Sequence, residues 1–130
     1  MTIGDRVISG TGVEYLADIF GCAPDLLRSR ERLDAIMSRL ISEVGVHPIR
    51  DPLWQIFPGP GGVTGLWLLA ESHLAVHTYP ETQFAAISLY CCRSPRDWPS
   101  ETRLRAWFEA ERVDVQTVNR GRKQEPCGRS

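Results

Sequence analysis

From residue 48 onward, the sequence is a series of short apolar stretches separated by prolines and glycines. Each stretch is rich in the β-branched and aromatic residues that favour strands, and the joint at 58–62, PGPGG, is the strongest turn signal in the chain. The stretches are Pro48–Phe57, Val63–Glu71, His73–Tyr79 and Phe84–Cys92. This succession predicts a mostly antiparallel sheet.

Two helices and two more strands are predicted around this series. The first helix has Pro24 in its first turn and ends at Gly45, and apolar side chains recur along it at spacings of three and four. These apolar residues are Leu33, Ile36, Met37, Leu40, Ile41 and Val44. A second helix is predicted over Ser100–Ala110, and strands are predicted over Val13–Phe20 and Arg112–Val118. The resulting order indicates the α+β class: an antiparallel sheet with two helices on one face.

The length and composition fit one domain. The chain has 130 residues, and the 42% that are hydrophobic are sufficient for a core. We expect a single domain over residues 1–118 and a mobile tail over 119–130, where apolar residues are lacking; residues 1–11 should also be loose.

With 15 basic and 16 acidic side chains, the net charge of −1 gives no electrostatic reason to expect nucleic acid or an anionic membrane as a partner.

The sequence also bears on the compartment. No apolar stretch is long enough to cross a bilayer, and the opening MTIGDRVISGTG has no basic region followed by an apolar one. We therefore expect a cytoplasmic protein.

The four cysteines are too few and too unevenly placed for a disulfide framework, and no C-x-x-C pair indicates zinc. They should remain thiols.

One layer of two helices can cover only one face of the predicted sheet. The other face must be buried by something else, and a second copy of the chain is the simplest candidate. We therefore predict a homodimer that packs sheet to sheet.

The segment 68–82, LLAESHLAVHTYPET, places carboxylates, hydroxyls and two histidines in an otherwise apolar region. In strands, alternate residues share a face. One such set is Thr64, Leu66, Leu68, Ala70 and Ser72; the next is His73, Ala75, His77 and Tyr79; the third is Phe84, Ala86, Ser88, Tyr90 and Cys92. Hydroxyls, an imidazole and a thiol would converge if these three strands were neighbours.

Two general chemistries fit this segment poorly. His73 and His77 have the spacing of a helical zinc pair, but on a strand the same spacing separates them by about 13 Å, too far for one ion. A Ser72–His77 nucleophile and base would need the strand-turn-helix elbow of a hydrolase, which is absent. Taken one at a time, these residues are typical of ordinary turn and strand positions.

The complete string is more specific. Gly62-Val63-Thr64-Gly65, Leu69-Ala70-Glu71-Ser72-His73, His77-Thr78-Tyr79-Pro80-Glu81 and Phe84-Ala85-Ala86 together strongly resemble the short prokaryotic S-adenosylmethionine decarboxylases, which are pyruvoyl-dependent enzymes. The resemblance extends over residues 12–121, and the run from Ala70 to Glu81 is its most specific part. It implies an α/β sandwich with antiparallel sheets that associates as a dimer.

The resemblance implies that the chain cuts itself between Glu71 and Ser72, giving fragments 1–71 and 72–130. The Ser72 hydroxyl would attack the Glu71 carbonyl, and elimination of the resulting ester followed by hydrolysis would leave a covalent pyruvoyl group at residue 72. His77 matches the family residue that promotes the elimination, because an imidazole can take and give protons near neutral pH. Thr64 stands where the family usually has a serine, and it would support the processing with its hydroxyl.

The resemblance also assigns the decarboxylation. The pyruvoyl ketone would condense with a substrate amine and accept the electron pair left when carbon dioxide departs. Cys92 matches the proton donor, with the adjacent Cys91 read as a core residue. Glu81 matches the carboxylate that holds the ribose hydroxyls, Phe57 resembles the aromatic that stacks on adenine, and Tyr79 lies near the ligand. For Phe57 an ordinary core position remains an equal alternative.

The implied product is decarboxylated S-adenosylmethionine, the aminopropyl donor for spermidine synthesis. The chain departs from the family pattern at several positions near the site, and Thr82-Gln83 replaces the usual aromatic-glycine pair after Glu81. Two alternatives therefore stay open: the same chemistry on arginine or ornithine, and an uncleaved, non-catalytic member that acts as a partner-binding subunit.

Overall fold

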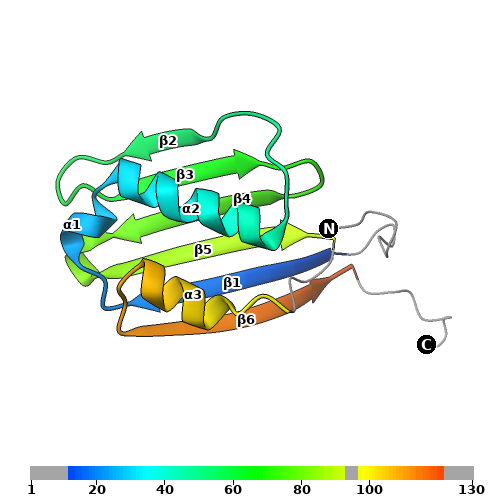
Figure 1. Ribbon diagram of the computed structural model, residues 1–130. Helices are drawn as coiled ribbons and strands as arrows, with labels where there is room; N and C mark the ends of the chain where they lie inside the picture. The colour runs from blue at the N-terminus through cyan, green and yellow to red at the C-terminus, as the bar shows by residue number, and fades with distance from the viewer. Residues whose placement is uncertain (1–11, 93–96, 122–130) are drawn as a thin grey trace, which may run out of the picture.

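A six-stranded antiparallel sheet organises the computed structural model, which describes residues 12–92 and 97–121 (Figure 1). The strands are β1 (Gly12–Phe20), β2 (Leu53–Ile56), β3 (Val63–Leu68), β4 (His73–Tyr79), β5 (Phe84–Cys91) and β6 (Arg112–Arg120). Their spatial order is β2-β3-β4-β5-β1-β6. The helices are α1 (Pro24–Leu27), α2 (Arg30–Val44), the short 3₁₀ turn η1 (Pro80–Thr82) and α3 (Ser100–Trp107).

Figure 1 shows α2 and α3 on the same face of the sheet, as the sequence predicted. The apolar stripe of α2 is buried against the strands, and Leu104 and Phe108 attach α3 to the same layer. Each fully buried aliphatic or aromatic side chain contributes about 1.5–3 kcal/mol. The core is formed by the helix-facing residues of the strands, among them Ile19, Trp67, Leu74, Val76, Ile87 and Leu89.

The first predicted helix is two helices in the structure. Ser29 lies between α1 and α2, and its hydroxyl accepts a hydrogen bond from the backbone N–H of Arg32 at 3.1 Å. This N-cap starts a new helix because it satisfies one of the N–H groups that a helix leaves free at its beginning. The predicted end at Gly45 is confirmed: this residue has φ 86° and its N–H donates to the Ile41 carbonyl at 3.0 Å.

Several strand ends differ from the prediction. β2 begins at Leu53, because between Pro48 and Leu53 only an isolated bridge from Pro48 to Leu69 pairs this segment with the sheet. β3 ends at Leu68 because the chain then turns back into β4. At the other edge, β6 continues to Arg120, which pairs with Gly12 of β1; the predicted tail therefore begins later than residue 119. Residues 1–11 and 122–130, where loose segments were expected, lie outside the described part.

No helix covers the second face of the sheet in the described residues (Figure 1). Exposed leucines from the neighbouring strands β2 and β3 stand on this uncovered face. Leu53 is 72% exposed, Leu66 45% and Leu68 58%. Adjacent exposed apolar side chains of this kind are typical of interaction surfaces.

Candidate active site

The Glu71–Ser72 bond lies in the tight turn between β3 and β4. The turn is closed by a hydrogen bond from the Leu69 N–H to the Ser72 carbonyl at 2.9 Å. Ala70 and Glu71 are exposed and Ser72 is half-buried. The bond proposed for cleavage is therefore held in a defined turn at the end of the sheet, outside the regular strand ladder.

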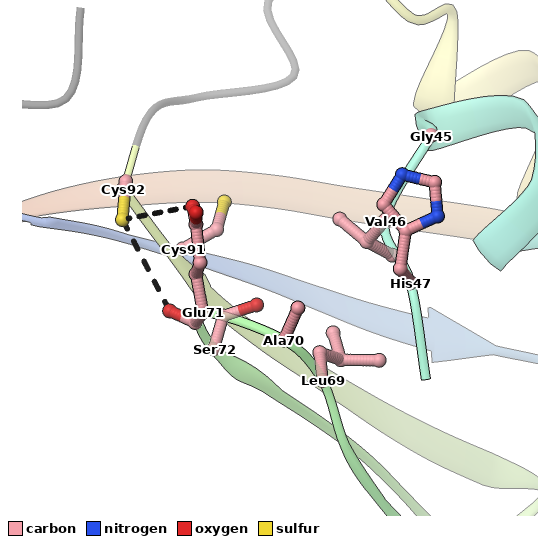
Figure 2. A pocket seen from close by; sticks show the side chains of 9 residues that line it. All are labelled: Gly45, Val46, His47, Leu69, Ala70, Glu71, Ser72, Cys91 and Cys92. Atoms are coloured by element: carbon pink, nitrogen blue, oxygen red, sulfur yellow. Dashed lines mark hydrogen bonds between the residues drawn. The ribbon is translucent and has the colours of Figure 1, made fainter. Parts of the chain in front are cut away.

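A pocket of about 90 Å³ lies against this turn (Figure 2). It is lined by Gly45, Val46, His47, Leu69, Ala70, Glu71, Ser72, Cys91 and Cys92. The walls are mainly apolar, and Ser72, Glu71, Cys92 and His47 supply the groups that can exchange protons. Residues from α2's end, the β3–β4 turn and the end of β5 thus meet around the predicted nucleophile.

The thiol of Cys92 faces Glu71. Its Sγ lies 3.7 Å from Glu71 Oε1 and 4.0 Å from the Glu71 carbonyl oxygen, and Figure 2 draws both contacts. Partial burial, followed by the negative charge of Glu71 and the hydrogen bond to it, raises the pKa of the Cys92 thiol above its usual value. The thiol therefore keeps its proton at neutral pH, as a proton donor must.

Thr64 and His77 form a second pair of functional groups. They are directly opposite each other in β3 and β4, and Thr64 Oγ1 lies 3.0 Å from His77 Nδ1. Both side chains are half-buried on the face of the sheet that the helices leave uncovered. The contact fixes the orientation of the imidazole, which a proton-transfer group requires.

The predicted substrate-binding residues gather in a larger pocket of about 510 Å³ beside this pair. Phe57, Tyr79 and Glu81 line it together with Thr64 and His77. Phe57 is 48% exposed, which excludes the core position that the sequence had left open. Two aromatic side chains and one carboxylate around a space of this size suit a flat, polar molecule.

This pocket is positioned by Thr78, whose side chain points to the opposite, helix-covered face. Its buried hydroxyl donates to the Leu27 carbonyl at 2.7 Å and accepts from the Val63 N–H at 2.9 Å. It thereby joins α1 to the start of β3, next to Thr64. Gly62 is required here because a Cβ would come within 2.6 Å of the Thr78 carbonyl oxygen.

The predicted functional groups do not all meet within one protomer. β3, β4 and β5 are neighbours, but Ser72 and Cys92 lie at one end of β4 and the Thr64–His77 pair lies towards the other. Five residues of strand separate Ser72 from His77, or about 16 Å. Register therefore divides the predicted site into a Ser72 pocket and a His77 pocket.

Two features of the site were missed in the sequence. His47 lines the Ser72 pocket, but it is 25 positions before Ser72 and no motif connects the two. An aromatic row also continues from the His77 pocket: the rings of Tyr79 and Phe84 are 5.7 Å apart and those of Phe84 and Phe20 5.2 Å apart. Cross-strand pairing makes this row, and alternation within a single strand could not indicate it.

The described residues contain neither a metal-binding cluster nor a membrane-spanning helix. No group of three or more His, Cys, Asp or Glu side chains there is placed to hold a metal ion. In the same part of the chain, no helix has both the length and the apolar character to span a membrane.

Comparison with known proteins bears on this arrangement. Residues 13–121 match the family model described as S-adenosylmethionine decarboxylase. The S-adenosylmethionine decarboxylase proenzyme of Acetivibrio thermocellus is 32% identical over 92% of this chain and 95% of its own. The proenzyme of Carboxydothermus hydrogenoformans is 33% identical over 88% of this chain and 89% of its own.

The fold agrees with these sequence matches. The crystal structure of the adenosylmethionine decarboxylase from Aquifex aeolicus VF5 superposes with a TM-score of 0.75 and 25% identity, covering 91% of this chain and 97% of that one. A family model over most of the chain, relatives matched nearly end to end and a shared fold lead to one conclusion. This chain belongs to the S-adenosylmethionine decarboxylase family.

Proposed function

We propose that this chain is a self-processing, pyruvoyl-dependent enzyme that converts S-adenosylmethionine to its decarboxylated form, the aminopropyl donor for spermidine synthesis. The observation that carries the proposal is the placement of Glu71–Ser72 in a turn whose neighbouring thiol, Cys92, lies 3.7–4.0 Å from Glu71. Family relatives named as proenzymes support the self-processing.

The turn suits the first step of processing. The Ser72 hydroxyl attacks the Glu71 carbonyl carbon, the C–N bond between the two residues breaks, and the amide becomes an ester with a free amine at residue 72. Removal of the Cα proton of residue 72 then breaks the bond between Cβ and Oγ of this residue. The main-chain carboxylate of Glu71 leaves, and residue 72 becomes dehydroalanine. Hydrolysis of the resulting dehydroalanine releases ammonia and leaves the pyruvoyl group.

The residues around Ser72 fit such a group. The Glu71 carbonyl points towards a thiol, and the adjoining pocket has mainly apolar walls. The pyruvoyl ketone supplies an electron sink for decarboxylation. Cys92, with a raised pKa, holds the proton that must be returned to the substrate's α-carbon.

The pocket around Glu81 favours a nucleoside substrate over arginine or ornithine. Its volume of about 510 Å³ is larger than a linear basic amino acid needs. Such a substrate also does not need the exposed rings of Phe57 and Tyr79. An aromatic face attracts a sulfonium cation as well as stacking on a purine. The Glu81 carboxylate can accept hydrogen bonds from ribose hydroxyls.

We further propose that the working unit is a cytosolic homodimer, packed through the uncovered face of the sheet. The exposed leucines of β2 and β3 supply an apolar surface for this contact. If the two-fold axis runs between the two sheets and perpendicular to the strands, the strands of one protomer run opposite to those of its partner. The Ser72 pocket of one protomer then faces the His77 pocket of the other. This arrangement would complete a site that a single protomer leaves divided by about 16 Å.

Mass spectrometry of the purified chain tests the proposal. The expected masses are those of fragments 1–71 and 72–130, the second blocked by pyruvate, whereas Ser72→Ala should give only the intact chain. Release of labelled carbon dioxide should then be measured with S-adenosylmethionine, arginine and ornithine. An intact wild-type chain would support the non-catalytic alternative, and release from arginine or ornithine alone would correct the substrate.

A further inference from the structure

His47 is the imidazole that lines the Ser72 pocket in the described residues. It lies across the pocket from Cys92, on the loop that follows α2 (Figure 2). His77, which the family resemblance implicates in processing, belongs to the other pocket and is about 16 Å from Ser72 within the same protomer. Within one chain, the histidine at the Ser72 pocket is therefore His47 and not His77.

The His47 loop is fixed to the turn that contains the cleavage site. The Ala70 N–H donates to the His47 carbonyl at 2.8 Å, and the Ile49 N–H donates to the Leu68 carbonyl at 2.9 Å. Gly45, with φ 86°, turns the chain out of α2, and the following proline restricts His47 to extended backbone. These bonds are made by the backbone, so they hold residue 47 at the pocket without engaging its imidazole.

The other groups that line the pocket are less suited to accept the Ser72 proton. The Cys92 thiol holds its own proton, because burial and the charge of Glu71 raise its pKa. Cys91 is buried, and the carboxylate of Glu71 faces Cys92. An imidazole is the side chain best suited to take and return a proton near neutral pH.

We propose that His47 carries the proton in the first step of self-processing in this chain, an inference that rests on the function proposed above. The hydroxyl proton of Ser72 passes to His47 as Ser72 Oγ bonds to the Glu71 carbonyl carbon. As the C–N bond breaks, the same proton passes to the nitrogen of residue 72, which leaves as an amine. No water, oxidant or reductant is consumed. The pocket of about 90 Å³ has room for a water that bridges the transfer.

The experiment follows the appearance of the two fragments over time after cell-free synthesis of the full chain, by denaturing electrophoresis and mass spectrometry. His47→Ala should slow cleavage at least about tenfold, and added imidazole should restore much of the rate. His73→Ala is the matched control: His73 is also next to the turn, but it stacks on Tyr90 and does not line the pocket. It should cleave at the wild-type rate.

The outcomes separate the two proposals. If the wild-type chain is cleaved and His47→Ala is cleaved equally fast, the role of His47 is wrong and the proposed function stands. If cleavage of His47→Ala is slow but imidazole does not restore it, His47 is structural and the inference is also wrong. A wild-type chain that never cleaves would overturn both.

Discussion

Thr64 Oγ1 lies 3.0 Å from His77 Nδ1, across adjacent strands of the face that the helices leave open. The two residues are 13 positions apart in sequence and become partners only through the β3–β4 register. Because one ring nitrogen faces Thr64, the orientation of the imidazole and the access to its other nitrogen are set by this contact.

Loss of this contact should impair the function of His77. Thr64→Val keeps the shape of the side chain but removes the hydroxyl, and we expect cleavage to slow by about tenfold, the equivalent of one hydrogen bond of about 1.4 kcal/mol. Thr64→Ser, which keeps the hydroxyl, should cleave almost normally. Equal rates for the valine and serine variants, measured as fragment appearance over time, would show that the hydroxyl has no role.

A mixture of two defective chains tests the shared site. Ser72→Ala and His77→Ala should each be cleavage-defective alone. In a mixed dimer, the intact Ser72 of one chain meets the intact His77 of the other, so only the chain carrying His77→Ala should be cut. Mass spectrometry of the coexpressed pair identifies which chain is cleaved. If neither chain is cut, the site is not shared between protomers in this way.

The acidity of Cys92 should depend on Glu71. Burial is the larger cause of the raised pKa of Cys92, and the Glu71 carboxylate adds to it. The thiol is the form present below its pKa, so proton donation should persist at neutral pH and fall as the pH rises through that value. Glu71→Gln should shift alkylation of Cys92 to lower pH, because thiolate is the form that reacts. Site-specific alkylation measured by mass spectrometry checks this, with Cys22 as the control: burial raises its pKa to about 11, and it should not change.

Gln83 should be a site of backbone strain beside the substrate pocket. It has φ 56°, and its carbonyl accepts the N–H groups of Gly21 and Cys22 at 2.9 and 3.1 Å, which hold it there. A left-handed conformation is costly for any residue with a Cβ. Gln83→Gly should therefore raise the free energy of unfolding by about 0.5–1 kcal/mol, as measured in denaturant. Gln83→Ala keeps the Cβ and should bring no such gain.

Local patterns in the sequence predicted much of this fold. The spacing of apolar residues identified the buried face of α2 because a helix repeats every 3.6 residues, and the apolar stretches between prolines and glycines predicted β2 to β5. Predicted boundaries failed where a side chain or a partner strand decided them. Ser29 begins a new helix through its own hydroxyl, and β6 extends to Arg120 because β1 offers a partner as far as Gly12.

The sequence by itself determined the family and supplied the candidate cleavage motif and candidate site residues, because these depend on residue identity along a continuous run. Only the tertiary structure decided which of them meet. Strand register pairs Thr64 with His77 and separates both from Ser72, and a loop after α2 brings His47 to the Ser72 pocket. Register and loop docking are set by packing between distant segments, and that information is not contained in any local stretch of the chain.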